Sequence, residues 1–143
     1  MKKIIDYINF YLGCEVTFPE STLGAKYTIA ASMNGTAYLN MAYKGRFSTV
    51  IQDIRIIKPL LRKMDSITED ECKNLYYNIY NEYHKGMTYK SWWLDEDNEH
   101  YTTNFRLYAG EHRVNAINYL RSISIDMDGL IDAGLAIDKE TIK

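Results

Sequence analysis

Few side chains in this sequence have the types and spacing that known catalytic or metal sites require. The three histidines, His84, His100 and His112, are dispersed, and neither Cys14 nor Cys72 has a histidine near it in sequence. The sequence has no phosphate-binding or dinucleotide-binding glycine loop, no His-Glu-x-x-His zinc motif and no nucleophile elbow. We therefore predict no catalytic residue, no metal site and no cofactor. A small enzyme of unknown type stays an alternative, because distant residues can meet in a fold.

The acidic run at residues 95–99 has the alternating carboxylates of a calcium-binding loop. Counted from Asp95, such a loop needs glycine at its sixth position and glutamate at its twelfth, where this chain has His100 and Arg106. An acidic surface loop is the better interpretation. Adjacent tryptophans cannot share a direction on a helix or strand, so one should be buried and the other should lie at a rim or meet a partner. The candidate partner-binding residues are Trp92, Trp93, Asp95, Glu96, Asp97 and Glu99.

Basic residues concentrate between residues 44 and 63, where Asp53 is the only acid. Clustered lysine and arginine neutralise phosphates, so this segment suggests nucleic-acid binding as an alternative function. The candidate residues for it are Arg55, Lys58, Arg62 and Lys63. However, no nucleic-acid-reading motif accompanies them, and the net charge of the chain is −2. A solvated or internally paired basic face is the favoured interpretation.

The first half of the chain predicts one short helix and a small antiparallel sheet. Apolar residues at helical spacing predict a helix over residues 2–12, and alternation over 14–18 predicts a first strand. Asn34-Gly35 between two β-compatible runs predicts a hairpin with a type I′ turn. The pairs expected across it are Met33 with Thr36, Ala31 with Tyr38 and Ile29 with Asn40. A third strand is predicted over residues 47–51, and Pro59 favours an extended course for residues 54–61.

The second half predicts helices. Thr68-Glu-Asp-Glu71 is a capping box, and the helix that it opens should end at Gly86. One face of this helix carries Cys72, Leu75, Tyr76, Ile79, Tyr80 and Tyr83, and the chain has 13 tyrosines, which suit half-buried faces and interfaces. Residues 101–108 predict a further edge strand.

The C-terminal part predicts two helices, or one broken helix. From Glu111 the apolar stripe is Val114, Ile117, Leu120 and Ile123, and the pattern restarts at Met127, Leu130, Ile131 and Leu135. Gly129 should interrupt the helix and Gly134 should end it. Leu135 and Ile137 should fold back on the core.

Two stretches of the chain resemble a protein family. The tail, Asp128-Gly-Leu-Ile-Asp-Ala-Gly-Leu-Ala-Ile-Asp-Lys-Glu-Thr141, resembles the C-terminal signature of small uncharacterised proteins from bacterial prophages and mobile elements. Residues 57–71 are similar to that family's Lys-Pro-x-Leu-Arg-x-x-x-Asp-x-x-Thr-Glu-Glu stretch, with Lys63 and Met64 replacing Pro-Leu. The resemblance implies a small intracellular accessory protein of phage origin, and it implies no catalytic residue.

The whole sequence is typical of one α+β domain over residues 1–143, with a small antiparallel sheet packed by amphipathic helices mainly from the C-terminal half. No apolar run is long enough to span a membrane, and two isolated cysteines favour reduced thiols in a bacterial cytoplasm. The leading hypothesis is a non-enzymatic accessory protein that binds another protein, for example as an anti-CRISPR-like inhibitor of a host defence system. A nucleic-acid-binding protein and a virion structural protein are alternatives, and the oligomeric state stays open.

Overall fold

The structure, a computed structural model, describes residues 2–83, 85–93 and 111–141. The chain divides into two compact units. The sheet unit comprises Met1–Arg62 and Arg121–Lys143, and the helical unit comprises Lys63–Leu120. The single domain over residues 1–143 stays a prediction, and its test is whether both units unfold together.

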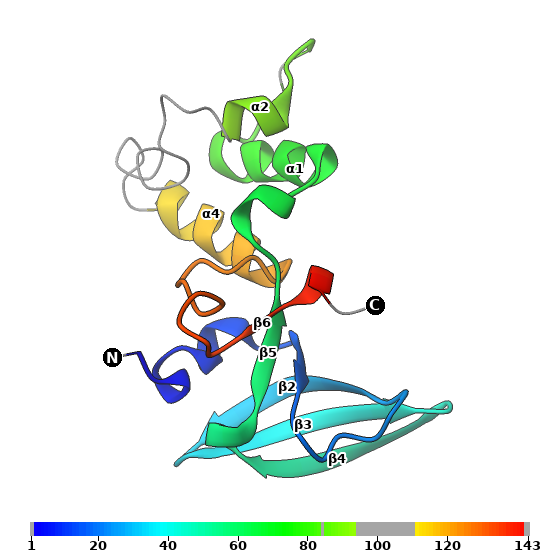
Figure 1. Ribbon diagram of the computed structural model, residues 1–143. Coiled ribbons are helices and arrows are strands. Elements are labelled where there is room, and N and C mark those ends of the chain that lie inside the picture. The colour runs from blue at the N-terminus through cyan, green and yellow to red at the C-terminus, as the bar shows by residue number, and fades with distance from the viewer. Residues whose placement is uncertain (1, 84, 94–110, 142–143) are drawn as a thin grey trace. The chain divides into compact units, whose positions relative to one another are not determined.

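The described part of the sheet unit contains a six-stranded sheet in the order β4-β3-β2-β1-β5-β6. The strands are β1 Glu15–Thr17, β2 Lys26–Met33, β3 Thr36–Tyr43, β4 Arg46–Asp53, β5 Lys58–Leu61 and β6 Ile137–Asp138. Neighbouring strands are antiparallel except β5 and β6, which are parallel. In Figure 1, β2, β3 and β4 form one long ribbon, and β6 runs beside β5. This mostly antiparallel sheet and the helices later in the chain confirm the predicted α+β class.

The turn between β2 and β3 forms as the sequence predicts. Asn34 and Gly35 have φ angles of 52° and 79°, which a type I′ turn requires. The predicted pairs of Met33 with Thr36 and of Ala31 with Tyr38 are both present.

The predicted pair of Ile29 with Asn40 is wrong, because a β-bulge between Ile29 and Ala31 shifts the register by one residue. Ile29 lies opposite Leu39 instead. Both side chains are almost fully buried, at 1% and 0% exposure. The bulge therefore keeps two large apolar residues on the buried face of the sheet.

The predicted helix over residues 2–12 is instead two short 3-10 helices, η1 Ile4–Asp6 and η2 Ile8–Tyr11. Tyr7 separates them with a φ of −120°, outside helical geometry. The apolar spacing still serves the core, since Ile4, Ile8 and Tyr11 are all buried. Another 3-10 helix, η3 Ile54–Ile56, connects β4 to β5.

The predicted helix after Met127 is also wrong. Residues 126–136 form successive turns, followed by β6 and the 3-10 helix η6 Lys139–Thr141. Gly129 and Gly134 have φ angles of 71° and 77°, so neither continues a helix. The sequence predicts that Gly134 ends a helix, and in the structure it ends a turn. Its N–H donates to the Ile131 carbonyl and the Leu135 N–H donates to the Leu130 carbonyl, the hydrogen-bond pattern of a helix C-terminus.

The described helices of the helical unit are η4 Met64–Ser66, α1 Glu69–Tyr80, α2 Tyr89–Trp93 and α4 Glu111–Ser122, whose last two residues enter the sheet unit. The capping box is confirmed, because Thr68 and Glu71 exchange both hydrogen bonds. The predicted end at Gly86 is wrong. Asn81 ends α1 in the left-handed conformation, with a φ of 58°, which asparagine tolerates better than most residues.

Helix α4 begins where the sequence predicts, but its buried stripe differs. Val114 is 54% exposed, whereas Ala116 and Leu120, one turn apart, are fully buried. The buried side of α4 is therefore defined by Ala116 and Leu120, four residues apart, and not by the predicted stripe that begins at Val114. Among the described residues, no helix has the length and apolar character needed to cross a membrane.

Candidate functional site

The two tryptophans have different environments, as predicted for adjacent residues. Trp93 is fully buried, and its Nε1–H donates to the Met64 sulfur at 3.3 Å. Trp92 is half-buried, and its ring centroid lies 5.1 Å from that of Tyr76. Trp93 is therefore a core residue, and only Trp92 stays a candidate for partner contact. The other candidates, Asp95, Glu96, Asp97 and Glu99, lie outside the described residues, as does the predicted strand over 101–108.

Helix α1 and the turn after it expose three tyrosines, Tyr77, Tyr80 and Tyr83, which we call the tyrosine face. Their residue exposures are 41%, 40% and 52%. Tyr77 and Tyr83 stack with their ring centroids 4.8 Å apart and their planes 20° from parallel. The Lys73 ammonium lies 5.0 Å from the Tyr83 centroid, in a cation–π arrangement. Asn81, in the left-handed conformation, ends α1 at a position between Tyr77 and Tyr83 in the sequence.

Buried aromatic rings support the tyrosine face from behind. Tyr76 is buried and packs against Tyr80, with centroids 4.5 Å apart, and against Tyr89 at 5.4 Å. Helix α2 is joined to α1 because the Glu69 carboxylate accepts the backbone N–H groups of Tyr89 and Lys90, both at 2.8 Å. A carboxylate at a helix N-terminus is favourable for both its hydrogen bonds and its charge.

The tyrosine face has the chemistry of a binding surface. Tyrosine offers a large apolar ring with a polar tip and only two side-chain torsions to immobilise, which is why it is enriched at protein interfaces. Ring–ring contacts restrain these torsions before any partner arrives, which lowers the entropic cost of binding.

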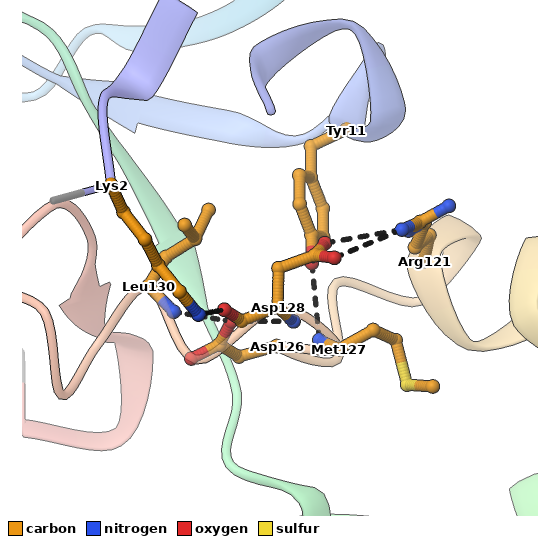
Figure 2. A network of polar contacts seen from close by, with 7 residues as sticks. All are labelled: Lys2, Tyr11, Arg121, Asp126, Met127, Asp128 and Leu130. Carbon is orange, nitrogen blue, oxygen red and sulfur yellow. Dashed lines mark hydrogen bonds and ion pairs between the residues drawn. The ribbon is translucent and has the colours of Figure 1, made fainter. Parts of the chain in front are cut away.

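The sheet unit holds a polar cluster centred on Asp128, which we call the Asp128 network (Figure 2). One Asp128 oxygen accepts the Tyr11 hydroxyl at 2.6 Å. The Arg121 Nη2 donates to both oxygens, at 3.0 and 3.3 Å. The Tyr11 oxygen in turn accepts the Met127 N–H at 3.0 Å. The arginine and aspartate side chains are only 18% and 15% exposed, so this ion pair is largely shielded from water.

Asp126 completes the network by organising the backbone that follows it. Its carboxylate accepts the N–H groups of Asp128, Leu130 and Ile131, at 3.3, 2.9 and 2.9 Å. The Lys2 ammonium donates to the Asp128 carbonyl (Figure 2). Side chains thus take the backbone donors that helical bonds would have used, which explains why this segment turns instead of continuing α4.

The Asp128 network stabilises the fold and is poorly suited to catalysis. Burial and the hydrogen bond to Asp128 raise the pKa of Tyr11 far above its ordinary value, so this hydroxyl stays protonated. Arg121 packs its guanidinium 4.1 Å from the Phe10 ring centroid and bridges the end of α4 to the turn. These groups bind one another, although the buried Nε of Arg121 has no hydrogen-bond partner among the described residues. The Tyr11 hydroxyl, held in its protonated form, is not an activated nucleophile.

The four candidate basic residues differ in their local partners. Arg55 binds Asp53 at 2.6 Å, and this interaction lowers the pKa of Asp53 to about 2. The Arg62 guanidinium donates to the Ile123 carbonyl at 3.3 Å. Lys58 is exposed on β5, and Lys63 belongs to the helical unit, so the structure does not group it with the other three. Two of the four candidate cations therefore have partners within the sheet unit.

A cavity of about 610 Å³ opens beside the N-terminal turns of the sheet unit. Its polar side chains include Lys2, Lys3, Asp53 and Arg55. Lys2 is bound to the Asp128 carbonyl, and Arg55 is bound to Asp53. Three of these four charged side chains therefore already have partners, and the other lining residues are mainly apolar. Across the described ranges, no group of three or more potential metal-ligating side chains is found.

Both cysteines are buried free thiols. Burial raises the pKa of Cys14, whose sulfur accepts the Ser124 hydroxyl at 3.2 Å. Burial and the nearby Glu69 carboxylate raise the pKa of Cys72 to about 12. Because the thiolate is the reactive form, both side chains should be inert in the folded protein.

We expect neither thiol to react with iodoacetamide at pH 8 in the folded state, whereas both should react in urea. A pKa of about 12 instead of 9.0 lowers the thiolate fraction of Cys72 by about 1000-fold. The folded protein binds the Cys72 thiol proton more tightly than the unfolded chain does. This tighter binding stabilises the folded state below pH 9, and the stabilisation is lost as the pH rises through the folded pKa of Cys72. Mass spectrometry of Cys14→Ala and Cys72→Ala variants would assign each rate. Native labelling of Cys72 at the unfolded rate would contradict this prediction.

Sequence reasoning missed the two arrangements that matter most here. Tyr11 and Asp128 meet although 117 positions separate them, and no periodicity signals such a pair. The stacking of Tyr83 on Tyr77 depends on where α1 ends, which the sequence analysis placed too late. The one available signal was the helical spacing of Lys73, Tyr77 and Tyr80 at i, i+4 and i+7.

The chain was compared with protein-family models, with curated proteins and with solved structures, and none of the three comparisons found a match.

Proposed function

We propose that this chain is a non-enzymatic accessory protein of a phage or mobile element that acts by binding another protein through the tyrosine face. The observation that carries the proposal is the exposure of Tyr77, Tyr80 and Tyr83 on rings already held by aromatic neighbours. The resemblance of the tail to prophage proteins supports the proposed origin. Inhibition of a host defence protein is the most concrete form of this function.

The partner should offer a pocket for aromatic rings and a basic rim. Lys73 and the tyrosine hydroxyls are the polar groups of the face itself. The acidic residues Asp95, Glu96, Asp97 and Glu99 follow α2 directly in sequence. A partner that normally binds nucleic acid combines aromatic-stacking sites with positive charge, and a defence nuclease is of this kind.

The test is an affinity capture from host lysate with the tagged protein, run with and without nuclease and read by mass spectrometry and nucleic-acid staining. We expect wild type and a Leu23→Ala control to recover the same stoichiometric protein, because Leu23 is 96% exposed in the sheet unit, outside the tyrosine face. A Tyr77→Ala/Tyr83→Ala variant should lose it.

With the purified partner, the double variant should bind at least tenfold more weakly, since interface tyrosines often contribute about 2 kcal/mol each. Two results would count against the proposal. One is undiminished binding of the double variant, and the other is recovery of nucleic acid alone. The latter would shift the assignment to Arg55, Lys58, Arg62 and Lys63.

A further inference from the structure

Strand β4 is an edge strand of the described sheet. It pairs with β3 without interruption from Arg46 opposite Tyr43 to Asp53 opposite Thr36. No described residue pairs with its other side, and it lies at the outer side of the sheet in Figure 1. Natural edge strands are commonly protected by proline, a bulge or a central charge. β4 has none of these, since its charges stand only at its two ends.

The backbone groups that face outward from β4 follow from its turn. Lys44 and Gly45 have φ angles of 49° and 75° and form a two-residue loop. The residues flanking such a loop, Tyr43 and Arg46, exchange hydrogen bonds, and antiparallel pairs then alternate along the ladder. Arg46 and every second residue after it therefore bond to β3. Residues 47, 49 and 51 direct their N–H and C=O groups outward.

The same residues carry the exposed apolar side chains. Phe47 is 83% exposed and Ile51 is 62% exposed, on the sheet face opposite the buried Leu39. Thr49 lies midway between them. Phe47 and Ile51 are thus placed symmetrically about Thr49, along a strand with one basic end and one acidic end.

We propose that β4 pairs with β4 of a second copy of this chain, antiparallel, with the two-fold axis passing beside Thr49. In this register Phe47 lies opposite Ile51 of the second copy, and Thr49 lies opposite Thr49. The outward backbone groups of all three positions are satisfied across the axis. Arg46 then lies opposite Gln52 of the second copy, so no like charges face each other across the axis.

Self-complementarity is what identifies a second copy as the occupant. A two-fold axis normal to a sheet pairs residues whose numbers sum to an even value, which keeps each residue opposite one on the same face. Pairing about Thr49 satisfies this condition. It brings the outward backbone groups of the two β4 strands together and places Phe47 beside Ile51 of the second copy. A one-strand interface is smaller than the standard size, so association should be weak and dependent on concentration.

Sedimentation equilibrium of the purified protein tests the dimer, and residue 49 gives the sharpest variants. Thr49→Lys and Thr49→Asp should each weaken association at least tenfold, because like charges lie directly opposite each other. An equimolar mixture of the two should restore a dimer, since lysine then faces aspartate. Thr28→Lys is the matched control: Thr28 lies opposite Asn40, and Asn40 lies opposite Thr49, so the new charge is in the same cross-strand row but two strands from the edge.

Circular dichroism should show that each variant keeps its sheet. A wild-type protein that stays monomeric up to millimolar concentration would overturn the proposal. So would a dimer that Thr49→Lys leaves unchanged, or a lysine–aspartate mixture that fails to associate. A dimer weakened equally by Thr28→Lys would place the contact elsewhere and would also refute this register.

Discussion

Deletion of residues 127–143 should unfold the sheet unit. The deletion removes Leu130 and Ala136, which are 0% and 6% exposed in its core, and it removes strand β6 from beside β5. It also removes Asp128, the acceptor of both Tyr11 and Arg121. Loss of one buried leucine side chain alone costs about 2–5 kcal/mol. Small domains have a total stability of only about 5–15 kcal/mol, so the combined loss should exceed it.

The thiols measure this unfolding. Cys14 lies in the sheet unit and should become reactive in the truncated protein, whereas Cys72 reports on the helical unit. A truncation of residues 139–143 is the matched control, because its described residues, 139–141, are exposed and it removes only the long ion pair of Lys139 with Glu15 at 3.9 Å. Exposed pairs contribute less than about 1 kcal/mol. A protected Cys14 after deletion of 127–143 would show that the tail is not part of the core.

Labelling of Cys72 in the same experiment tests the predicted single domain. If the chain is one cooperative domain, both thiols should become reactive together. Protection of Cys72 alone would mean that the helical unit folds by itself. Either result for Cys72 leaves the prediction for Cys14 unchanged.

Local signals in the sequence predicted local structure well. The type I′ turn needs positive φ at two adjacent positions, and Asn34-Gly35 supplies both at low cost. The capping box needs only Thr68 and Glu71. In each case residues adjacent in sequence determine the conformation, so no knowledge of the rest of the fold is needed.

The wrong register at Ile29 and the wrong helix after Met127 have different causes, and neither shows in the apolar spacing. Because of the bulge, Ile29 lies buried opposite Leu39, whereas a regular register would have placed it opposite Asn40. The apolar spacing after Met127 is compatible with a helix. The carboxylate of Asp126 and the parallel pairing of β6 with β5 give the backbone other partners.

The resemblance in the tail has a structural explanation that does not require a binding site. Its first acidic residue, Asp128, binds Tyr11 and Arg121, and its two glycines adopt positive φ. Asp138, directly before η6, accepts the Glu140 N–H at 3.1 Å. Asp128, Asp138 and the two glycines of the tail thus have roles in the fold of the sheet unit. The tail therefore gives little information about the partner.

Replacement of Asp128 by alanine should destabilise the protein by about 3 kcal/mol, because it leaves a largely buried guanidinium and the Tyr11 hydroxyl without an acceptor. Asp132→Ala is the matched control, since it removes an exposed carboxylate from the same segment. Urea denaturation would measure both changes, and we expect less than about 0.5 kcal/mol for the control.

A double-mutant cycle separates the ion pair from general damage to the turn. Arg121→Met alone removes the cation that binds Asp128 and leaves the Tyr11 hydroxyl as its side-chain donor, so it should also be destabilising. Removing both partners leaves no unpaired buried charge, so Asp128→Ala/Arg121→Met should cost less than the sum of the two single changes. Strict additivity would show that Asp128 acts through the backbone of its turn and that the contact with Arg121 contributes nothing. That result would favour Asp126, which binds three backbone N–H groups, as the residue that holds the tail in place.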